Sequence, residues 1–335
     1  MSNLNFFQSK KFWARAKNIQ NDVEFNSLSI ELFQYQAEHV VVYRDFLNYL
    51  KTDISSITHF SEIPFLPVSF FKNHVISDQK AIPNFYFSSS GTTGQATSRH
   101  YVPDSTIYDE SLLHGFEIAY GHPSQYVILA LLPSYLEREG SSLIYMVEKL
   151  IAESGNTEGG FFLHNHEALH EKIKNLEASG KKIFLIGVTY ALLDFFEKYP
   201  MQLSHTILLE TGGMKGRRKE LIKSELHEQL KLMSGVETVH SEYGMTELLT
   251  QAYSKGEGIF DTPSWMKILV RDLHDPFSNL KSGQTGTLNI IDLANIHSCA
   301  FLATDDLGRK HSGDFFEVLG RIDHSELRGC NLMVE

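Results

Sequence analysis

The chain has 335 residues, of which 42% are hydrophobic and 21% are charged, and it carries a formal net charge of −11 and two cysteines. This composition is typical of a folded globular protein with one large domain or two domains, and it excludes a largely disordered chain. The acidic balance argues against nucleic acid or an anionic membrane as a partner, and since the longest apolar run, 127–132, is far below a membrane span, we expect a cytoplasmic protein without a disulfide framework.

The N-terminal part of the chain predicts helical structure. Apolar and aromatic residues between Leu28 and Leu50 recur at the spacing of one helix face. The segment at 62–73, EIPFLPVSFFKN, contains two prolines three residues apart. Because proline disfavours helix at the residue before it, this segment predicts an extended lead into the next loop.

Between residues 100 and 260, apolar strand-like runs alternate with segments of helical period, which predicts an α/β sheet. The predicted strands are 126–132, 182–186, 207–209 and 236–240, and the predicted helices are 141–154, 166–179, 189–198 and 216–233. After residue 260, short strands with turn signals predict a small β-rich lobe. We therefore divide the chain into an α/β core with a helical N-terminal segment at 1–260 and a β-rich lobe at 261–335.

A hydroxyl-rich loop, FSSSGTTG, occupies residues 87–94. Backbone N–H groups and Ser or Thr hydroxyls bind phosphate, and Gly91 and Gly94 let the backbone approach it closely. The loop does not match the Walker pattern, because no Lys follows Gly94. Alone, such a loop is most often only a connection, so its interpretation depends on the rest of the chain.

Five motifs in chain order resemble the core motifs of the adenylate-forming superfamily, which includes acyl-CoA synthetases and luciferases. They are FSSSGTTG at 87–94, ETGG at 210–213, SEYGMTE at 241–247, HSGD at 311–314 and GRIDHSELRG at 320–329. Three further stretches, LPVSFFKN, LLPSYLEREGSSLIYM and RGCNLM, are most similar to the LuxE-type acyl-protein synthetases of the bacterial bioluminescence fatty-acid reductase complex. The resemblance runs from residue 60 to the end and implies that superfamily's large α/β domain, with a β-rich lobe and without the mobile C-terminal domain.

The resemblance implies ATP and Mg²⁺ as cofactors and assigns contacts to the nucleotide. Gly212 and Gly213 would lie along the adenine, and Tyr243 and Gly244 would contact the base, with the tyrosine ring stacked on it. Asp314 would accept hydrogen bonds from the ribose hydroxyls. The phosphates would be wrapped by Ser88, Ser89, Ser90, Gly91, Thr92, Thr93 and Gly94.

Three further residues are assigned to the reaction itself. Thr246 would sit near the α-phosphate, and Glu247 would hold Mg²⁺, for which carboxylate and phosphate oxygens are the usual ligands. Arg321 would reach the ribose or a phosphate.

Two departures from the superfamily pattern concern positive charge. The phosphate loop lacks the usual lysine, so Arg99 or His100 would have to replace it. The GRID motif usually precedes the mobile domain with a catalytic lysine, yet no lysine follows Lys310. We expect a partner subunit, Arg321 or Arg328 to supply the missing cation, or adenylation to be slow.

The acceptor predicted for the acyl group is Cys330, which matches the position of the acylated cysteine of LuxE-type enzymes. A thiolate attacks an acyl-adenylate readily, and Arg328 nearby would favour the thiolate. The alternative is that Cys330 is a small apolar residue, as we expect of Cys299. The histidines of HNHEALH at 164–170 have a spacing that zinc can use, but a polar helix face is the expected interpretation.

The first hypothesis for function is an ATP-dependent ligase that converts a long-chain fatty acid into an acyl-adenylate and then transfers the acyl group to Cys330 as a thioester. An acyl reductase and a transferase subunit are the implied partners. The second hypothesis is an acid–CoA or aryl–CoA ligase. The third is a degenerate adenylate-binding subunit that scaffolds a reductase or ligase without catalysis.

Overall fold

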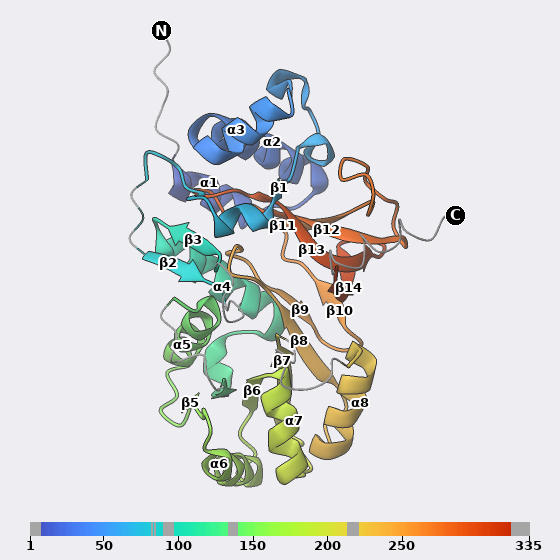
Figure 1. Ribbon diagram of the computed structural model, residues 1–335. Helices are drawn as coiled ribbons and strands as arrows, with labels where there is room; N and C mark the ends of the chain where they lie inside the picture. Colours follow the sequence, from blue (N-terminus) through green and yellow to red (C-terminus); the bar gives the residue numbers. More distant parts are fainter. Residues whose placement is uncertain are drawn as a thin grey trace, which may run out of the picture.

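A long mixed sheet connects the two ends of the molecule (Figure 1). The computed structural model describes residues 8–81, 83, 85–89, 97–132, 140–212 and 221–322. Within these residues, twelve strands form one sheet in the order β11–β12–β13–β14–β10–β9–β8–β7–β6–β4–β5, with β1 joined to β13. A separate sheet of two strands pairs β2 (Phe85–Ser88) with β3 (Arg99–Val102). The bounds in the large sheet are β1 (Leu66–Pro67), β4 (Val127–Leu131), β5 (Gly160–Phe161), β6 (Ile183–Val188), β7 (Thr206–Thr211), β8 (Val239–Tyr243), β9 (Ala252–Ser254), β10 (Ile259–Asp261), β11 (Met266–Arg271), β12 (Thr285–Asp292), β13 (Phe301–Lys310) and β14 (Phe315–Arg321).

The parallel half of the sheet consists of β5, β4, β6, β7 and β8. Every residue of β4 and β6 is buried, because helices pack against these strands. The helices of this half are α4 (Ser105–Tyr120), α5 (Ser142–Ser154), α6 (His166–Ala178), α7 (Thr189–Lys198) and α8 (Lys223–Ser234). The predicted α/β fold class is therefore confirmed.

Several boundaries in this half differ from the prediction. The helix predicted at 216–233 includes Ile222, but the backbone of that residue is extended and α8 begins at Lys223. The strand predicted at 236–240 is β8 and starts at Val239. The elements α4, β9 and β10 were not predicted.

The other half of the sheet is antiparallel, from β8 through β9, β10 and β14 to β13, β12 and β11. These strands confirm the expected β-rich texture after residue 260. Phe260 itself lies inside β10, which pairs on both sides with neighbouring strands. The sheet thus continues across the predicted boundary, and the division of the chain at that residue stays a prediction.

The N-terminal segment is helical but is not one helix. It forms α1 (Ser9–Ala16), α2 (Asp22–His39) and α3 (Val41–Tyr49), and the helix predicted between Leu28 and Leu50 is interrupted at Val40, whose backbone is extended. Only Leu66–Pro67 of the predicted extended segment is a strand. Single turns of 3₁₀-helix flank the strand and occur elsewhere, as η1 (Ile54–Ser56), η2 (Phe60–Glu62), η3 (Val68–Lys72) and η4 (Pro123–Gln125).

The N-terminal helices cover the antiparallel half through aromatic contacts. The ring of Phe33 in α2 packs edge-on against Phe301 in β13, with 6.0 Å between centroids. Trp13 in α1 packs in the same way against Trp265, at 5.5 Å. These contacts bury Trp265 completely and attach the start of the chain to its last third.

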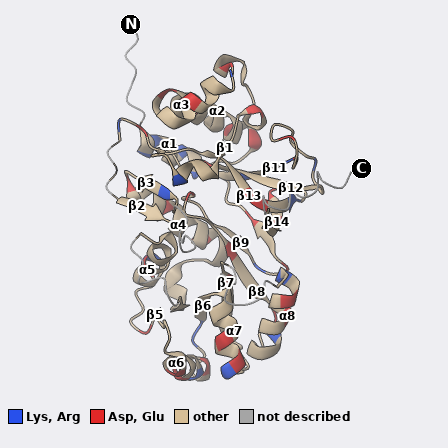
Figure 2. Ribbon diagram, viewed as in Figure 1, with Lys and Arg blue, Asp and Glu red and all other residues tan. Residues whose placement is uncertain are grey.

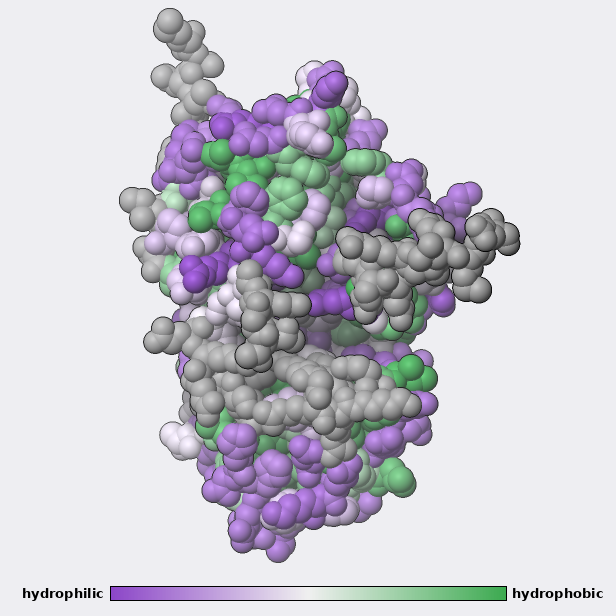
Figure 3. All heavy atoms as spheres, viewed as in Figure 1, coloured by the Kyte–Doolittle hydropathy of each residue, from purple (hydrophilic) through white to green (hydrophobic). Residues whose placement is uncertain are grey.

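Charged side chains lie mostly on helices and loops, and Lys and Arg are interspersed with Asp and Glu among the described residues (Figure 2). Hydrophilic residues dominate the lower part of the face in view, whereas hydrophobic ones show between them in the upper part (Figure 3). None of the helices in the described ranges is long and apolar enough to cross a bilayer.

Candidate functional site

Two predicted nucleotide-binding motifs meet at the carboxyl ends of β7 and β8. These strands are parallel, with Glu210 opposite Ser241 and Thr211 opposite Glu242, so the first two residues of ETGG lie beside the first two of SEYGMTE. Gly212 has a φ of 72°, a conformation that glycine adopts without strain. Ligands of α/β proteins bind at this edge of a sheet. Gly213 lies outside the described residues.

Tyr243, at the end of β8, is held by a carboxylate that the sequence analysis missed. Its hydroxyl donates a hydrogen bond of 2.8 Å to Asp306 Oδ2, and Arg321 Nε donates one of 3.0 Å to Asp306 Oδ1. Asp306 in β13 lies opposite Arg321 in β14, which brings both residues to Tyr243. Burial and the Asp306 carboxylate raise the pKa of Tyr243.

The predicted ribose ligand, Asp314, has different partners. It lies in the turn between β13 and β14 and accepts hydrogen bonds of 2.9 and 3.1 Å from Lys267 Nζ. Lys267 also pairs with Asp22 of α2 at 2.9 Å. Asp314 therefore takes part in an ion-pair network that joins α2 to the β-rich half, whereas Tyr243 and Arg321 gather around Asp306.

Among the residues that follow Tyr243 in SEYGMTE, only Glu247 is buried, whereas Gly244 is exposed and Thr246 is half-buried. Glu247 is 6% exposed, and burial raises its pKa although Ser98 donates a hydrogen bond to it. The backbone oxygen of Thr246 accepts a hydrogen bond of 2.9 Å from His100 Nδ1. Burial lowers the pKa of His100 to about 4, so this histidine is neutral at pH 7 and does not supply the cation missing from the phosphate loop. Arg99, the other predicted substitute, is exposed and lies over the ring of Tyr86.

Glu210, near the end of β7, binds side chains of the neighbouring elements. This carboxylate is fully buried and accepts hydrogen bonds from Thr189 Oγ1 at 3.0 Å, from Lys223 Nζ and from Ser241 Oγ. Burial alone would raise the pKa of Glu210, but Lys223, His227 and Ser241 outweigh it and lower the pKa to about 2. The first residue of ETGG is thus a structural anion whose positive partner comes from α8.

Glu242 is a second, half-buried carboxylate at this edge, directly opposite Thr211. Among the described residues it forms no ion pair. Thr211 Oγ1 donates a hydrogen bond to it. Burial raises the pKa of Glu242 to about 7. A Cβ atom on Gly244 would lie 2.4 Å from Glu242 Oε1, so glycine is needed at position 244 for this carboxylate to pack there.

Ser88 and Ser89 lead into the predicted phosphate loop. The backbone N–H of Ser89 donates to the carbonyl oxygen of Ser98 at 3.0 Å, and the N–H of Ser98 donates back to Ser89 Oγ at 2.9 Å. This pair holds the two ends of the loop together. The other predicted loop residues, Ser90, Gly91, Thr92, Thr93 and Gly94, lie outside the described residues, as does Cys330.

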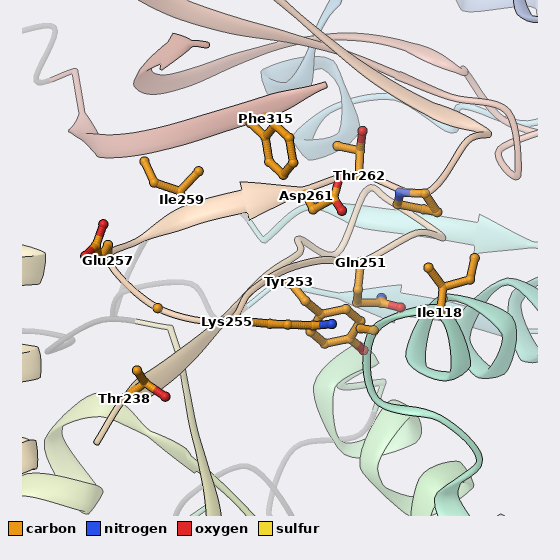
Figure 4. A pocket seen from close by; sticks show the side chains of 14 residues that line it. Ile118, Thr238, Gln251, Tyr253, Lys255, Glu257, Ile259, Asp261, Thr262 and Phe315 are labelled. Carbon is orange, nitrogen blue, oxygen red and sulfur yellow. The ribbon is translucent and has the colours of Figure 1, made fainter. Parts of the chain in front are cut away.

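A cavity of about 490 Å³ lies on strand β9, next to β8 (Figure 4). Gln251, Tyr253 and Lys255 line one side of it, and Ile118 and Ala119 of α4 line another. Nothing in the sequence pattern indicated this cavity, because it depends on how α4 packs against β9, two elements that were not predicted.

The remaining predictions concern cysteine and histidine. Cys299 is completely buried, and burial raises the pKa of its thiol to about 12, which confirms that it is a core residue. His170 and His166 pack against Tyr199 and Phe195 of the adjacent helix. The described ranges contain no group of three or more His, Cys, Asp and Glu side chains placed to hold a metal.

Comparison with known proteins supports the resemblance noted in the motifs. No protein-family model matches the chain. The chain is 25% identical over 329 residues to the long-chain-fatty-acid–luciferin-component ligase of Vibrio harveyi, a match that covers 90% of this chain and 84% of that protein.

Solved structures of adenylate-forming ligases share the fold. A 2-hydroxyisobutyryl-CoA ligase, in complex with 2-HIB-AMP and CoA, aligns with a TM-score of 0.65 and 13% identity over 92% of this chain and 72% of that chain. The long-chain-fatty-acid-CoA ligase FadD1 of Archaeoglobus fulgidus aligns with a TM-score of 0.54 and 16% identity over 76% of this chain and 55% of that one. ATP-bound MatB from Rhodopseudomonas palustris aligns with a TM-score of 0.53 and 15% identity over 70% of this chain. The match spans about half the length of MatB, 47%, and the predicted resemblance to the adenylate-forming superfamily is confirmed at the level of fold.

Proposed function

We propose that this protein activates a carboxylic acid with ATP. The observation that carries the proposal is the pairing of Thr211 with Glu242 at the carboxyl edge of the parallel strands, which supports binding of one nucleotide by both ETGG and SEYGMTE. In the reaction, a carboxylate oxygen attacks the α-phosphorus of ATP, a new P–O bond forms, and the bond to pyrophosphate breaks. The products are an acyl-adenylate and pyrophosphate.

The proposed nucleotide contacts follow the motifs, with one addition. Tyr243 and Gly244 lie beside the adenine with Gly212 and Gly213, and Ser88 to Gly94 wrap the phosphates. Asp306 joins Asp314 as a candidate for the ribose hydroxyls, because Asp306 already contacts Tyr243 and Arg321.

Three residues, Glu247, Arg321 and Thr246, are proposed to act at the reacting phosphate. Glu247 would bind Mg²⁺: its carboxylate is buried, and a divalent cation would compensate the burial that raises its pKa. When bound, Mg²⁺ neutralises charge on the phosphate oxygens. The side chain of Arg321 is 71% exposed although Asp306 fixes its Nε, so we propose that its remaining N–H groups and Thr246 contact the α-phosphate in place of the missing lysine.

The second proposed step is transfer of the acyl group to the protein. The thiolate of Cys330 attacks the carbonyl carbon of the acyl-adenylate, a C–S bond forms, and AMP leaves. The name of the Vibrio harveyi relative supports a long-chain fatty acid as substrate. The LuxE-type resemblance of the motifs implies an acyl reductase and a transferase subunit as the partners that use the thioester.

A second candidate function is an acid–CoA ligase. The structure of the 2-hydroxyisobutyryl-CoA ligase, which shares the fold and contains CoA, favours this candidate. The two functions differ in the thiol that accepts the acyl group.

Intact-protein mass spectrometry separates the candidates. The wild-type chain and Cys330→Ser are incubated with MgATP and a panel of fatty and aryl acids, with and without CoA. We expect an acyl mass increment on the wild type with ATP alone, which hydroxylamine removes and which Cys330→Ser lacks. Formation of acyl-CoA without a protein increment would replace the acyl-protein hypothesis, and ATP binding without either product would support the scaffold hypothesis.

A further inference from the structure

The cavity on β9 has an apolar side and a polar side (Figure 4). Ile118 and Ala119 of α4 and Ile259 of β10 form apolar walls, whereas Gln251 and Tyr253 are polar. Its volume of about 490 Å³ lies within the range of small-molecule pockets. A cavity of this kind suits a ligand that is mostly hydrocarbon but carries a polar substituent.

The polar side belongs to a buried cluster that reaches the end of β8. Glu242 and Tyr253 lie directly opposite each other in the antiparallel β8–β9 pair, so their side chains project from the same face of the sheet. Gln251 Nε2 donates a weak hydrogen bond of 3.4 Å to Tyr108 Oη of α4. We call Glu242, Tyr253, Gln251 and Tyr108 the Glu242 cluster. Tyr243 follows Glu242 directly in β8, so its side chain projects from the opposite face of the sheet.

Two atoms of the Glu242 cluster lack hydrogen-bond partners within the part of the chain that the structure describes. They are Gln251 Oε1 and the hydroxyl of Tyr253, in residues that are only 7% and 6% exposed. A buried polar atom without a partner is destabilising, so native structures retain such atoms mainly where a ligand or water completes them. Both residues line the same cavity, which points to one missing partner.

The chemistry of the two atoms restricts that partner. Gln251 Oε1 only accepts hydrogen bonds, whereas the Tyr253 hydroxyl donates one and accepts others. A methylene group can satisfy neither atom, and an ammonium group has no lone pair for the Tyr253 proton. A hydroxyl group donates its single proton to Gln251 Oε1 and accepts a hydrogen bond from the Tyr253 hydroxyl.

We propose that the acid activated by this protein carries a hydroxyl group, that Gln251 and Tyr253 bind this hydroxyl, and that the carbon skeleton occupies the cavity between α4 and β9. This inference rests on the proposed function and narrows its substrate class from fatty acids in general to hydroxylated acids. The Glu242 cluster then selects the substrate, while the residues around Tyr243 and Thr246 bind the nucleotide.

The first test compares acids that differ only in the hydroxyl group. Pyrophosphate release is measured with myristic acid against its hydroxylated derivatives and with benzoic acid against para-hydroxybenzoic acid. We expect kcat/KM of the wild type to favour one hydroxylated member by roughly 10-fold or more, because a site with unpaired polar groups rejects the analogue that lacks the hydroxyl. In Tyr253→Phe and Gln251→Leu this ratio falls toward one, whereas the control Tyr126→Phe keeps it.

The second test uses unfolding temperature without any ligand. Tyr253→Phe removes a buried hydroxyl that has no hydrogen-bond partner among the described residues, so we expect the unfolding temperature to stay the same or rise. Tyr126→Phe removes a buried hydroxyl that donates to the Tyr120 carbonyl at 2.7 Å, so we expect the unfolding temperature to fall. An equal fall in both variants would show that the Tyr253 hydroxyl is already paired and would overturn the proposal.

The outcomes separate this inference from the proposed function. Equal kcat/KM for hydroxylated and unhydroxylated acids, with pyrophosphate released from both, overturns the hydroxyl site and leaves acid activation intact. If no acid yields pyrophosphate, the proposed function fails, and stabilisation against heat by each acid alone decides the inference. If only the hydroxylated acids stabilise the protein, and Tyr253→Phe abolishes that effect, the hydroxyl site is supported. If both acids of every pair stabilise the protein equally, or neither does, the hydroxyl site is rejected.

Discussion

Asp306 and Asp314 lie on the same hairpin but have different electrostatic surroundings. Asp306 is in the middle of β13, nearly buried, and contacts Tyr243 and Arg321. Asp314 is in the turn, 44% exposed, and pairs with Lys267 and Lys310. A ligand at the end of β8 would contact the Asp306 carboxylate together with Tyr243. The contributions of Asp306 and Asp314 to nucleotide binding should therefore be compared.

Conservative substitutions test this difference. We expect Asp306→Asn to weaken ATP binding by about 10- to 100-fold, because it removes a charged acceptor and releases Tyr243 and Arg321 from their common partner. Asp314→Asn should change ATP affinity by less than about 3-fold, since Lys267 retains Asp22. Isothermal titration calorimetry measures both, and the opposite order would restore Asp314 as the residue that contacts the nucleotide.

Glu242 and Glu210, the two glutamates beside Thr211, are expected to make the stability of the protein depend on pH in opposite directions. The pKa of Glu242 is raised from 4.5 to about 7, so between these values the folded chain holds a proton that the unfolded chain has released. The free energy of unfolding therefore falls as pH rises through this window, by about 3 kcal/mol from Glu242. The pKa of Glu210 is lowered to about 2, so its contribution is present above pH 4.5 and is lost as pH falls toward 2.

Glu242→Gln isolates the first effect. Urea unfolding of the wild type and the variant between pH 5 and 7.5 should show the wild type losing stability relative to the variant as pH rises. A difference that stays constant across this range would mean that Glu242 titrates at its ordinary pKa.

At the scale of elements, α8 is fixed to the sheet by one internal ion pair. Lys223 Nζ contacts Glu210, whose side chain is 1% exposed. Lys231, on the same helix, pairs at 3.2 Å with Glu228, whose side chain is 75% exposed. The two lysines therefore provide a matched comparison between a buried and a surface partner.

Replacement of Lys223 by Met should lower the free energy of unfolding by about 3 kcal/mol, because the buried Glu210 carboxylate loses its cation. Lys231→Met should cost about 0.5 kcal/mol or less, as is typical of exposed pairs. Urea denaturation of both variants gives the values. If the two variants cost the same, Thr189, Ser241 and His227 are sufficient partners for Glu210.

The elements also show what sequence patterns can and cannot predict. The fully apolar runs of β4 and β6 predicted two buried parallel strands, because strands covered on both faces have no polar side. Helix α4 was missed because its buried face includes Ser111 and Gly115, which interrupt the helical periodicity of apolar residues in the sequence. The break at Val40 was missed as well, although β-branched residues there disfavour helix and Val40 bridges to Asp78.

In the candidate site too, features encoded in one short stretch of sequence could be predicted, whereas contacts between distant segments could not. Motifs such as SEYGMTE are local, so their place at the end of β8 could be anticipated from the residues alone. Asp306 and the Glu242 cluster depend on strand register and on helix packing: Asp306 meets Arg321 across a hairpin, and Glu242 meets Tyr253 across β8–β9. Such pairs become visible only when the strands are aligned.

At the scale of the whole molecule, the continuous sheet argues for one cooperative unit. The parallel and antiparallel halves share strand β8, which pairs with β7 on one side and with β9 on the other. Both tryptophans of the chain, Trp13 and Trp265, touch each other, and Trp265 Nε1 also donates to Ser111 of α4 at 3.2 Å. Tryptophan fluorescence therefore reports the junction between the N-terminal helices, the antiparallel strands and α4.

Thermal unfolding followed by two probes tests whether the two halves of the sheet unfold as one cooperative unit. Far-ultraviolet circular dichroism reports all helices, including α6, α7 and α8 at the far end of the sheet (Figure 1). We expect its midpoint to coincide with that of tryptophan fluorescence, because a shared sheet couples the two halves. Two separate midpoints would instead support the division of the chain near residue 260 into two domains.

The burial of Cys299 also determines how the protein can be labelled. Its thiol has no solvent exposure and a pKa of about 12, so at neutral pH it provides neither access nor thiolate for a maleimide. The sequence contains one other cysteine, at position 330. A maleimide dye or spin label that attaches to the folded wild-type chain at neutral pH would therefore mark position 330 without any engineered substitution. If Cys330 is the acyl acceptor, as proposed, competition between acylation and labelling would report how much of its thiol is occupied during turnover.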